Sequence, residues 1–224
     1  MAERAAKPLR EKSKRMVIVA IEGKGCSGKS LLAGRIAGRV SCLGEASAVA
    51  SLDDFCNPRA TRYSDGNEEG LQVYHQNFDE RLWEDEVLRP ACRNGRLQFE
   101  RDLLDARTDT YSNRVSVDLP QGGVLITEGL HVLKKVFRRY FDLALYLHIS
   151  DELQLERALR RDREERGKSE AEIRYKYKRR FVPSYEHFLK RDCPFEVADL
   201  VVDMSTPDRP ILLSGEKAKK VSCG

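Results

Sequence analysis

The sequence lacks several features that would place the protein in a membrane, secreted or nucleic-acid-binding class. No apolar run approaches the roughly 20 residues that a membrane-spanning helix needs. The six cysteines are scattered, with no Cys-x-x-Cys pair and no Cys/His spacing typical of zinc, which favours reduced thiols in a cytoplasmic protein. The net charge is only +4 although 34% of the residues are charged, so we expect no basic field of nucleic-acid-binding size.

The two ends of the chain also lack the patterns of packed elements. Residues 1–15 are basic but have no apolar core and contain two acids, which predicts a disordered lead-in rather than a signal or transit peptide. Residues 204–224 contain two prolines and a lysine-rich end, which predicts an extended tail. Between them, residues 16–203 have the size and apolar content of one α/β domain.

The most informative stretch is GKGCSGKS, from Gly23 to Ser30, which matches the phosphate-binding loop (P-loop) pattern. Glycines at these positions let backbone N–H groups surround phosphate oxygens without interference from side chains. Lys29 would add positive charge at the β- and γ-phosphates of ATP, and Ser30 would offer its hydroxyl to Mg²⁺. The predicted ATP-binding residues are Gly23, Gly25, Cys26, Ser27, Gly28, Lys29, Ser30 and Leu31.

The context of this loop supports the assignment. Residues 16–21 are apolar and β-branched, which predicts a buried strand before the loop, and residues 31–40 predict a helix after it. Gly34 and Gly38 share one face of that helix, which predicts close packing on a sheet.

Four more apolar segments, at residues 46–52, 123–127, 143–149 and 198–203, predict strands that alternate with helices. The expected fold is therefore an α/β, P-loop NTPase-like three-layer fold with a five-stranded, mostly parallel sheet.

Acidic residues follow two of these strands. Asp53 and Asp54 end the second strand, where open parallel sheets bind ligands, and Glu128 ends the third. An acid at the position of Glu128 is typical of a P-loop enzyme that holds Mg²⁺ directly or through water. Neighbouring residues of an extended segment point in opposite directions, so only one of Asp53 and Asp54 can face the γ-phosphate. Two solvated loop carboxylates are the alternative interpretation.

Residues 57–120 are expected to form the side of the site that receives the phosphate. They predict a mobile loop at 57–70, a helix at 79–93 and a hairpin flap with short strands at 97–101 and 114–119. The candidate substrate contacts in and beside this part are Asp54, Phe55, Asp79 and Asp105.

Residues 157–172 are predicted to form a lid. The arginine-rich helix in which the lid begins is expected to bury Leu155 and Leu159 along one stripe. It is either a solvated helix face with i,i+4 ion pairs or a guanidinium cluster that closes over a polyphosphate. The P-loop upstream favours the second interpretation. The arginines are Arg157, Arg160, Arg161, Arg163 and Arg166.

Four of these stretches together resemble one family. GKGCSGKS, SLDDF (51–55), ITEGL (126–130) and RRDREERG (160–167) are similar to motifs of the uridine kinase and phosphoribulokinase family, and the resemblance spans about residues 16–203. It implies a kinase that transfers the γ-phosphate of ATP to a hydroxyl of a small molecule, with a nucleoside as the leading case. It also implies that Asp53 is the general base, Glu128 the acidic partner of Mg²⁺, and Lys29, Arg161 and Arg166 the residues that stabilise the transferring phosphate.

The chain departs from the family pattern where a uridine kinase would recognise its base. The flap carries Leu104-Asp105 in place of the Tyr-Asp pair, no histidine lies between His75 and His131, and Ala158 replaces a lid arginine. Nicotinamide riboside kinases also show Asp-Asp-Phe at the second strand, so nicotinamide riboside, other nucleosides and non-nucleoside alcohols stay open as acceptors. A homo-oligomer also stays open.

Two other classes are alternatives to a metabolite kinase. One is a P-loop regulatory ATPase. The other is a nucleic-acid-binding protein that uses the basic residues 157–180, which the interleaved acids of that stretch disfavour. We therefore expect a small-molecule substrate and no nucleic-acid or membrane partner.

Overall fold

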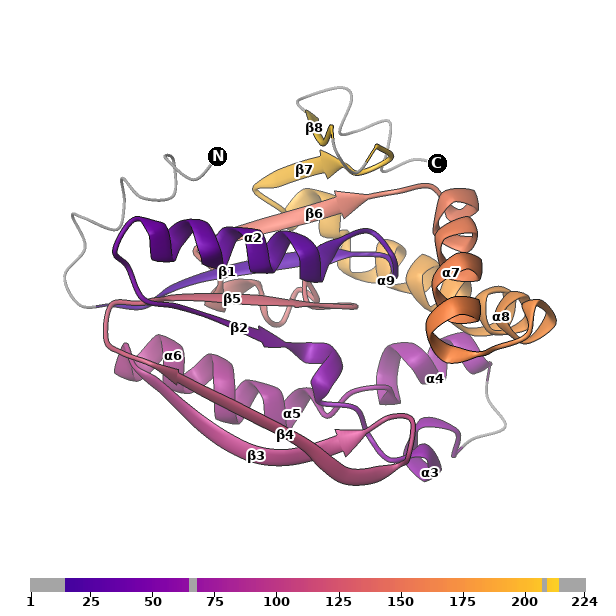
Figure 1. Cartoon of the computed structure of the whole chain (residues 1–224), viewed down its shortest axis with the longest axis horizontal. Helices are drawn as coiled ribbons and strands as arrows, with labels where there is room; N and C mark the ends of the chain where they lie inside the picture. The colour runs from indigo at the N-terminus through magenta and orange to yellow at the C-terminus, as the bar shows by residue number, and fades with distance from the viewer. Residues whose placement is uncertain (1–14, 65–67, 207–208, 214–224) are drawn as a thin grey trace.

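A six-stranded sheet forms the centre of the computed structural model, which describes residues 15–64, 68–206 and 209–213 (Figure 1). The strand order is β2-β5-β1-β6-β7-β8. Five strands run parallel and β8 is antiparallel to β7. The strands are β1 (Val17–Gly23), β2 (Ser47–Ser51), β5 (Val124–Gly129), β6 (Leu143–His148), β7 (Leu200–Asp203) and β8 (Ile211–Leu213).

The five predicted strands are thus confirmed, and β8 is an additional strand within the predicted C-terminal tail. The predicted lead-in at residues 1–14 and the tail end at residues 214–224 lie outside the described residues. None of the helices in the described ranges is both long and apolar enough to cross a membrane.

Apolar cores on both faces of the sheet confirm the predicted three layers. Because side chains alternate along a strand, Ile18 and Ala20 face one core while Val19 and Ile21 face the other. Helix α2 (Lys29–Cys42) covers the second face, and α9 (Val182–Asp192) packs on the first (Figure 1).

The predicted close packing of Gly34 and Gly38 on the sheet is wrong. A β-carbon added at either glycine would have no atom within 4 Å, and both residues are exposed. The helix buries Ala33 and Val40 instead, which turns the glycine face towards solvent. The shared face was correctly inferred, but the direction of that face depends on packing.

The predicted flap is a separate two-stranded antiparallel sheet below the central one (Figure 1). Its strands β3 (Leu97–Asp105) and β4 (Thr110–Leu119) are longer than predicted and include polar residues that face solvent. The expected loop at 57–70 contains the short helix α3 (Arg59–Arg62). The other segments here are η1 (Leu52–Asp54), α4 (Glu69–Gln76), α5 (Glu80–Trp83), the π-helical η2 (Glu84–Leu88) and α6 (Arg89–Asn94).

The predicted lid at residues 157–172 lies in the helix α7 (Asp151–Arg166), the connection after it and the start of α8 (Glu170–Lys176). Its buried stripe differs from the prediction: Leu155 and Leu159 are half-buried, and the buried residues are Gln154, Ala158 and Asp162. The most buried positions are thus shifted by one residue, while Leu155 and Leu159 still pack against the cluster of Ala158, Ile173 and Tyr177. Asp162 is buried and pairs with Arg161 and Arg166. The remaining segments are η3 (Arg138–Tyr140), the π-helical η4 (Tyr177–Phe181) and α10 (Pro194–Val197).

Candidate active site

The P-loop joins β1 to α2, and its backbone is left-handed at Cys26 (φ 64°) and Gly28 (φ 95°). Lys29 is buried, and its Nζ donates hydrogen bonds to the carbonyls of Gly23 at 3.0 Å and Lys24 at 3.3 Å. A β-carbon at Gly23 would lie 2.7 Å from the carbonyl oxygen of Leu147, so this position has no room for a side chain. The loop therefore holds its ammonium group against its own backbone.

Glu128 lies at the end of β5, where two hydroxyls converge on it. Ser30 and Ser51 each donate a hydrogen bond to Glu128 Oε1 at 3.0 Å. The pairing of β2 with β5 brings Ser51 level with Glu128. Burial, with the nearby charge of Asp53, raises the pKa of Glu128. The sheet register thus brings the predicted Mg²⁺ residues Ser30 and Glu128 into contact.

These oxygens fit a hard divalent cation. Glu128 Oε2 is buried and has no hydrogen-bond partner among the described residues, which leaves a carboxylate oxygen available beside the hydroxyl of Ser30. The described ranges contain no cluster of three or more His, Cys, Asp or Glu residues suited to a metal. Mg²⁺ at phosphate sites usually needs only one or two carboxylates, because water and substrate phosphates supply the other ligands. Ser30 and Glu128 would therefore hold it together with ATP.

The two neighbouring aspartates point towards different elements. Asp53 Oδ1 accepts a hydrogen bond from the N–H of Leu130 at 3.1 Å, at the end of β5. Asp54 Oδ1 accepts one from Asn113 Nδ2 on the flap at 3.2 Å, and burial raises the pKa of Asp54. The backbone at Gly129 allows the first arrangement, because a β-carbon there would lie 2.8 Å from Leu52 Cβ. Asp53 is thus the aspartate whose carboxylate lies at the end of β5, the strand that carries Glu128.

The other three candidate substrate residues each make contacts within the protein. Phe55 is buried and packs on Phe99 with ring centroids 5.6 Å apart. Asp79 caps α5 by accepting the N–H of Leu82 at 2.9 Å. Asp105 accepts the N–H of Arg107 at 2.7 Å within the flap turn. Contact of Phe55, Asp79 and Asp105 with an acceptor stays a prediction.

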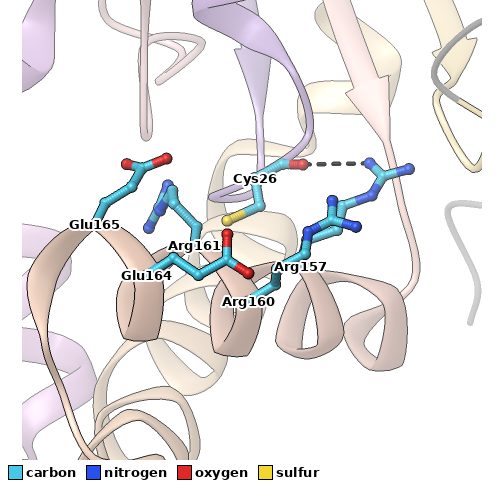
Figure 2. A pocket seen from close by; sticks show the side chains of 6 residues that line it. All are labelled: Cys26, Arg157, Arg160, Arg161, Glu164 and Glu165. Carbon is cyan, nitrogen blue, oxygen red and sulfur yellow. Dashed lines mark hydrogen bonds between the residues drawn. The ribbon is translucent and has the colours of Figure 1, made fainter.

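An open pocket of about 300 Å³ lies between α7 and Cys26 of the P-loop (Figure 2). Arg157 donates hydrogen bonds to the carbonyls of Cys26 at 3.2 Å, Met204 at 2.9 Å and Ser205 at 3.1 Å. The pocket is lined by Cys26, Arg157, Arg160, Arg161, Glu164 and Glu165.

The two predicted lid residues occupy different positions. Arg161 lines the pocket and pairs with Asp162 at 2.8 Å. Arg166 pairs with the same carboxylate at 3.4 Å, does not line the pocket, and has a side chain that is 43% exposed. The structure thus brings Arg161, but not Arg166, to the P-loop.

Sequence reasoning missed Glu22, the residue directly before the first glycine of the loop. Its side chain is completely buried and accepts hydrogen bonds from the backbone N–H groups of Gly23 at 2.8 Å, His131 at 3.3 Å and Leu133 at 3.1 Å. Burial raises the pKa of Glu22 to about 7. The available signal was an acid in an otherwise apolar strand. His131 is also buried, and burial holds its pKa well below the ordinary value, so this histidine is neutral near pH 7.

The chain matches parts of curated relatives. It is 32% identical over 101 residues to a uridine kinase of Streptococcus equi subsp. zooepidemicus, a match that covers 45% of this chain and 47% of that protein. It is 23% identical over 189 residues to the inorganic pyrophosphatase TTM2 of Arabidopsis thaliana, covering 84% of this chain and 26% of that protein. The chain thus spans about half or less of the length of these two relatives.

The fold matches that of a possible uridine kinase from Bacillus stearothermophilus, with a TM-score of 0.67 and 23% identity. That match covers 89% of this chain and 96% of the other. The model of the Phosphoribulokinase / Uridine kinase family matches residues 96–209, which make up half of the sequence. Together with the P-loop, the Glu128 cluster and the arginine lid, this match shows that the chain belongs to the Phosphoribulokinase / Uridine kinase family.

Proposed function

We propose that this protein transfers the γ-phosphate of ATP to a hydroxyl group of a small metabolite, with a nucleoside as the leading acceptor. The observation that carries the proposal is the convergence of Ser30 and Ser51 on Glu128, whose second carboxylate oxygen is buried and unpartnered among the described residues. Asp53 lies beside this cluster, bound to the N–H of Leu130. A P-loop, a cation site and a carboxylate base are the parts that phosphoryl transfer requires.

In this mechanism, the backbone N–H groups of the P-loop and the ammonium of Lys29 hold the β- and γ-phosphates. Ser30 and Glu128 would hold Mg²⁺, which would supply neutralising positive charge at these phosphates. Asp53 accepts the proton of the acceptor hydroxyl, and its hydrogen bond to Leu130 keeps the carboxylate directed towards the end of β5. Arg161 adds positive charge from the lid, which excludes water from the transfer.

Asp53 is assigned as the base in preference to Asp54. Asp53 is exposed and lies near enough to Glu128 to affect its pKa, so it belongs to the electrostatic surroundings of the cation site. Asp54 is directed to Asn113 of the flap, which suits a residue that orders the acceptor side. The assignment therefore separates a proton acceptor from a positioning contact.

The acceptor is chosen by the flap and its surroundings. Leu104, which has no hydroxyl, is buried where the family pattern has tyrosine, and Asp105 accepts a hydrogen bond within the flap turn. This favours an acceptor other than uridine within the nucleoside class, and nicotinamide riboside or another metabolite alcohol is the alternative.

The decisive experiment measures ATP consumption with a panel of acceptors: uridine, cytidine, nicotinamide riboside, pantothenate, glycerate and ribulose 5-phosphate. We expect one or more to raise the rate above that with ATP alone, and mass spectrometry to show a phosphorylated product. The control is Lys29→Ala, for which no acceptor should raise the rate. If no acceptor raises the wild-type rate although the protein binds ATP with Mg²⁺, the proposal that the protein phosphorylates a member of this panel is wrong.

A P-loop ATPase without an acceptor is the second candidate function. Its support is the 23% identity over 189 residues to a protein whose name describes an inorganic pyrophosphatase, because such an enzyme hydrolyses a phosphoanhydride and needs no alcohol acceptor. The same assay separates the two functions. An ATPase releases inorganic phosphate at a rate that no acceptor changes, whereas a kinase transfers phosphate to the acceptor.

A further inference from the structure

The segment that follows the end of β5 is held between two carboxylates. We call this segment, residues 130–133, the β5 turn. Asp53 accepts the N–H of Leu130 from one side at 3.1 Å. Glu22 accepts the N–H groups of the next residue, His131, at 3.3 Å and of Leu133 at 3.1 Å. The backbone N–H groups of one short segment therefore donate hydrogen bonds to two carboxylates, Glu22 and Asp53, which lie 31 positions apart in the sequence.

Glu22 also holds the start of the P-loop. Its Oε1 accepts the N–H of Gly23 at 2.8 Å, in addition to the N–H of His131. The pairing of β1 with β5 brings Glu22 level with Gly129, which explains how one side chain reaches both segments. A single buried carboxylate thus fixes the first residue of the P-loop relative to the β5 turn.

The backbone of the β5 turn needs such support. His131 has a φ of 68°, a left-handed conformation that is unfavourable for a residue with a β-carbon. Such residues persist where the surroundings hold them. The Nε2 atom of His131 lies 3.3 Å from Ser184 Oγ, and its N–H is bound by Glu22.

We propose that Glu22 is a positioning residue, which sets Asp53 relative to the P-loop by holding the β5 turn. The inference rests on the proposed function insofar as Asp53 is the base. Glu22 itself does not touch ATP or the acceptor. Its effect passes through the N–H groups of His131 and Leu133 to Leu130, whose N–H binds Asp53. A displacement of about 1 Å between base and phosphate lowers turnover by about 100-fold.

A pH profile provides a readout that a merely structural role would not change. Burial raises the pKa of Glu22 to about 7, and a protonated carboxyl must donate where the β5 turn requires an acceptor. The kcat/KM for ATP should therefore fall as pH decreases through about 7, and Glu22→Gln should remove this step. The groups that face Glu22 are Lys29 from α2, His131 from the β5 turn, Tyr146 from β6 and Tyr185 from α9.

Amide hydrogen exchange tests the inference without any acceptor. In Glu22→Gln, the new Nε2 group cannot accept the N–H of Leu133. We expect the amides of His131 and Leu133 to exchange about tenfold faster, and the amide of Leu130 to follow, because its bond to Asp53 loosens with the turn. An unchanged Leu130 amide alongside faster His131 and Leu133 amides would overturn the positioning role.

Two further measurements guard against a folding defect. The control Ile126→Val removes a buried methyl group of β5 from the core on the other face of the sheet and changes no hydrogen bond of Glu22, so Leu130 exchange should stay near the wild-type rate. If Glu22→Gln does not fold, NMR shifts of the wild-type amides of Gly23, Leu130 and Leu133 should titrate together near pH 7. A Leu130 signal that stays constant while the other two move contradicts the proposal.

A double-mutant cycle then connects the inference to turnover. Glu22→Gln should lower kcat for the best acceptor by about 10- to 100-fold and should have little further effect in Asp53→Asn. Equal effects in both backgrounds would show that Glu22 acts independently of Asp53. If the wild type phosphorylates no acceptor, the proposed function fails while the exchange result for Leu130 still decides the role of Glu22.

Discussion

The donor half and the acceptor half of the site are built on different supports. On the donor side, the P-loop, Ser51 and Glu128 lie at the ends of β1, β2 and β5, which pair within the central parallel sheet. On the acceptor side, the flap is a separate two-stranded sheet that reaches the site through side-chain contacts, such as Asn113 with Asp54. Under the proposed function, the residues that bind ATP would thus be fixed by the sheet, whereas the choice of acceptor would depend on a module that can change independently.

The difference between the two halves is tested most sharply by substituting the two neighbouring aspartates one at a time. Asp53→Asn should lower kcat by about 100- to 10,000-fold, because it removes the proton acceptor. Asp54→Asn should act mainly on KM for the acceptor through its contact with Asn113. Steady-state kinetics of both variants measure this. A larger loss of kcat in Asp54→Asn would reverse the assignment.

The next effect concerns the lid on the donor side. Arg157→Ala removes three hydrogen bonds, to the carbonyls of Cys26, Met204 and Ser205, and should raise KM for ATP by about tenfold. The control Arg163→Ala changes an exposed arginine of the same helix that does not line the lid pocket. Isothermal titration with an ATP analogue and Mg²⁺ checks the difference. Equal affinities for the two variants would show that Arg157 has no role in the donor half.

A smaller effect is expected where the flap turn docks on α3. Asp109 Oδ1 accepts the N–H of Arg59 at 2.8 Å and lies 3.5 Å from Arg62 Nη2. Asp109→Ala should raise KM for the acceptor several-fold, on the order of the 1 kcal/mol that such a contact contributes, with KM for ATP unchanged. Asp109→Asn is the matched control, because it keeps the oxygen and tolerates the left-handed φ of 60°. A parallel rise in KM for ATP would contradict the independence of the two halves.

The smallest effect concerns stability alone. Gly34→Ala and Gly38→Ala should each stabilise the protein by about 0.5–1 kcal/mol, because both glycines lie inside α2 with open space around them. Urea unfolding with a two-state fit measures the change. Kinetic constants should stay at wild-type values, and a loss of stability would mean that something packs against this face.

The part of the site that is encoded locally was predictable. A strand pattern, the loop GKGCSGKS and a helix pattern follow one another within about 25 residues. Parallel pairing of β1 with β5 then brings Glu128 to the same edge of the sheet as Ser30. The role of Glu22 was not predictable, because its partners His131 and Leu133 are distant in sequence and reach it through the register of β1 with β5. The outward face of Gly34 and the buried position of Asp162 likewise depend on which neighbours pack against each helix.

The hydrogen bonds of Arg157 have a mechanical consequence for the lid. One guanidinium joins α7 to the P-loop at Cys26 and to the segment after β7 at Met204 and Ser205. Opening of the lid therefore has to break contacts with the segment that follows β7 as well as with the loop. We expect α7, the P-loop and residues 204–205 to open as one cooperative unit, so that the frequency of lid opening depends on contacts made beyond β7 as well as on those of the loop.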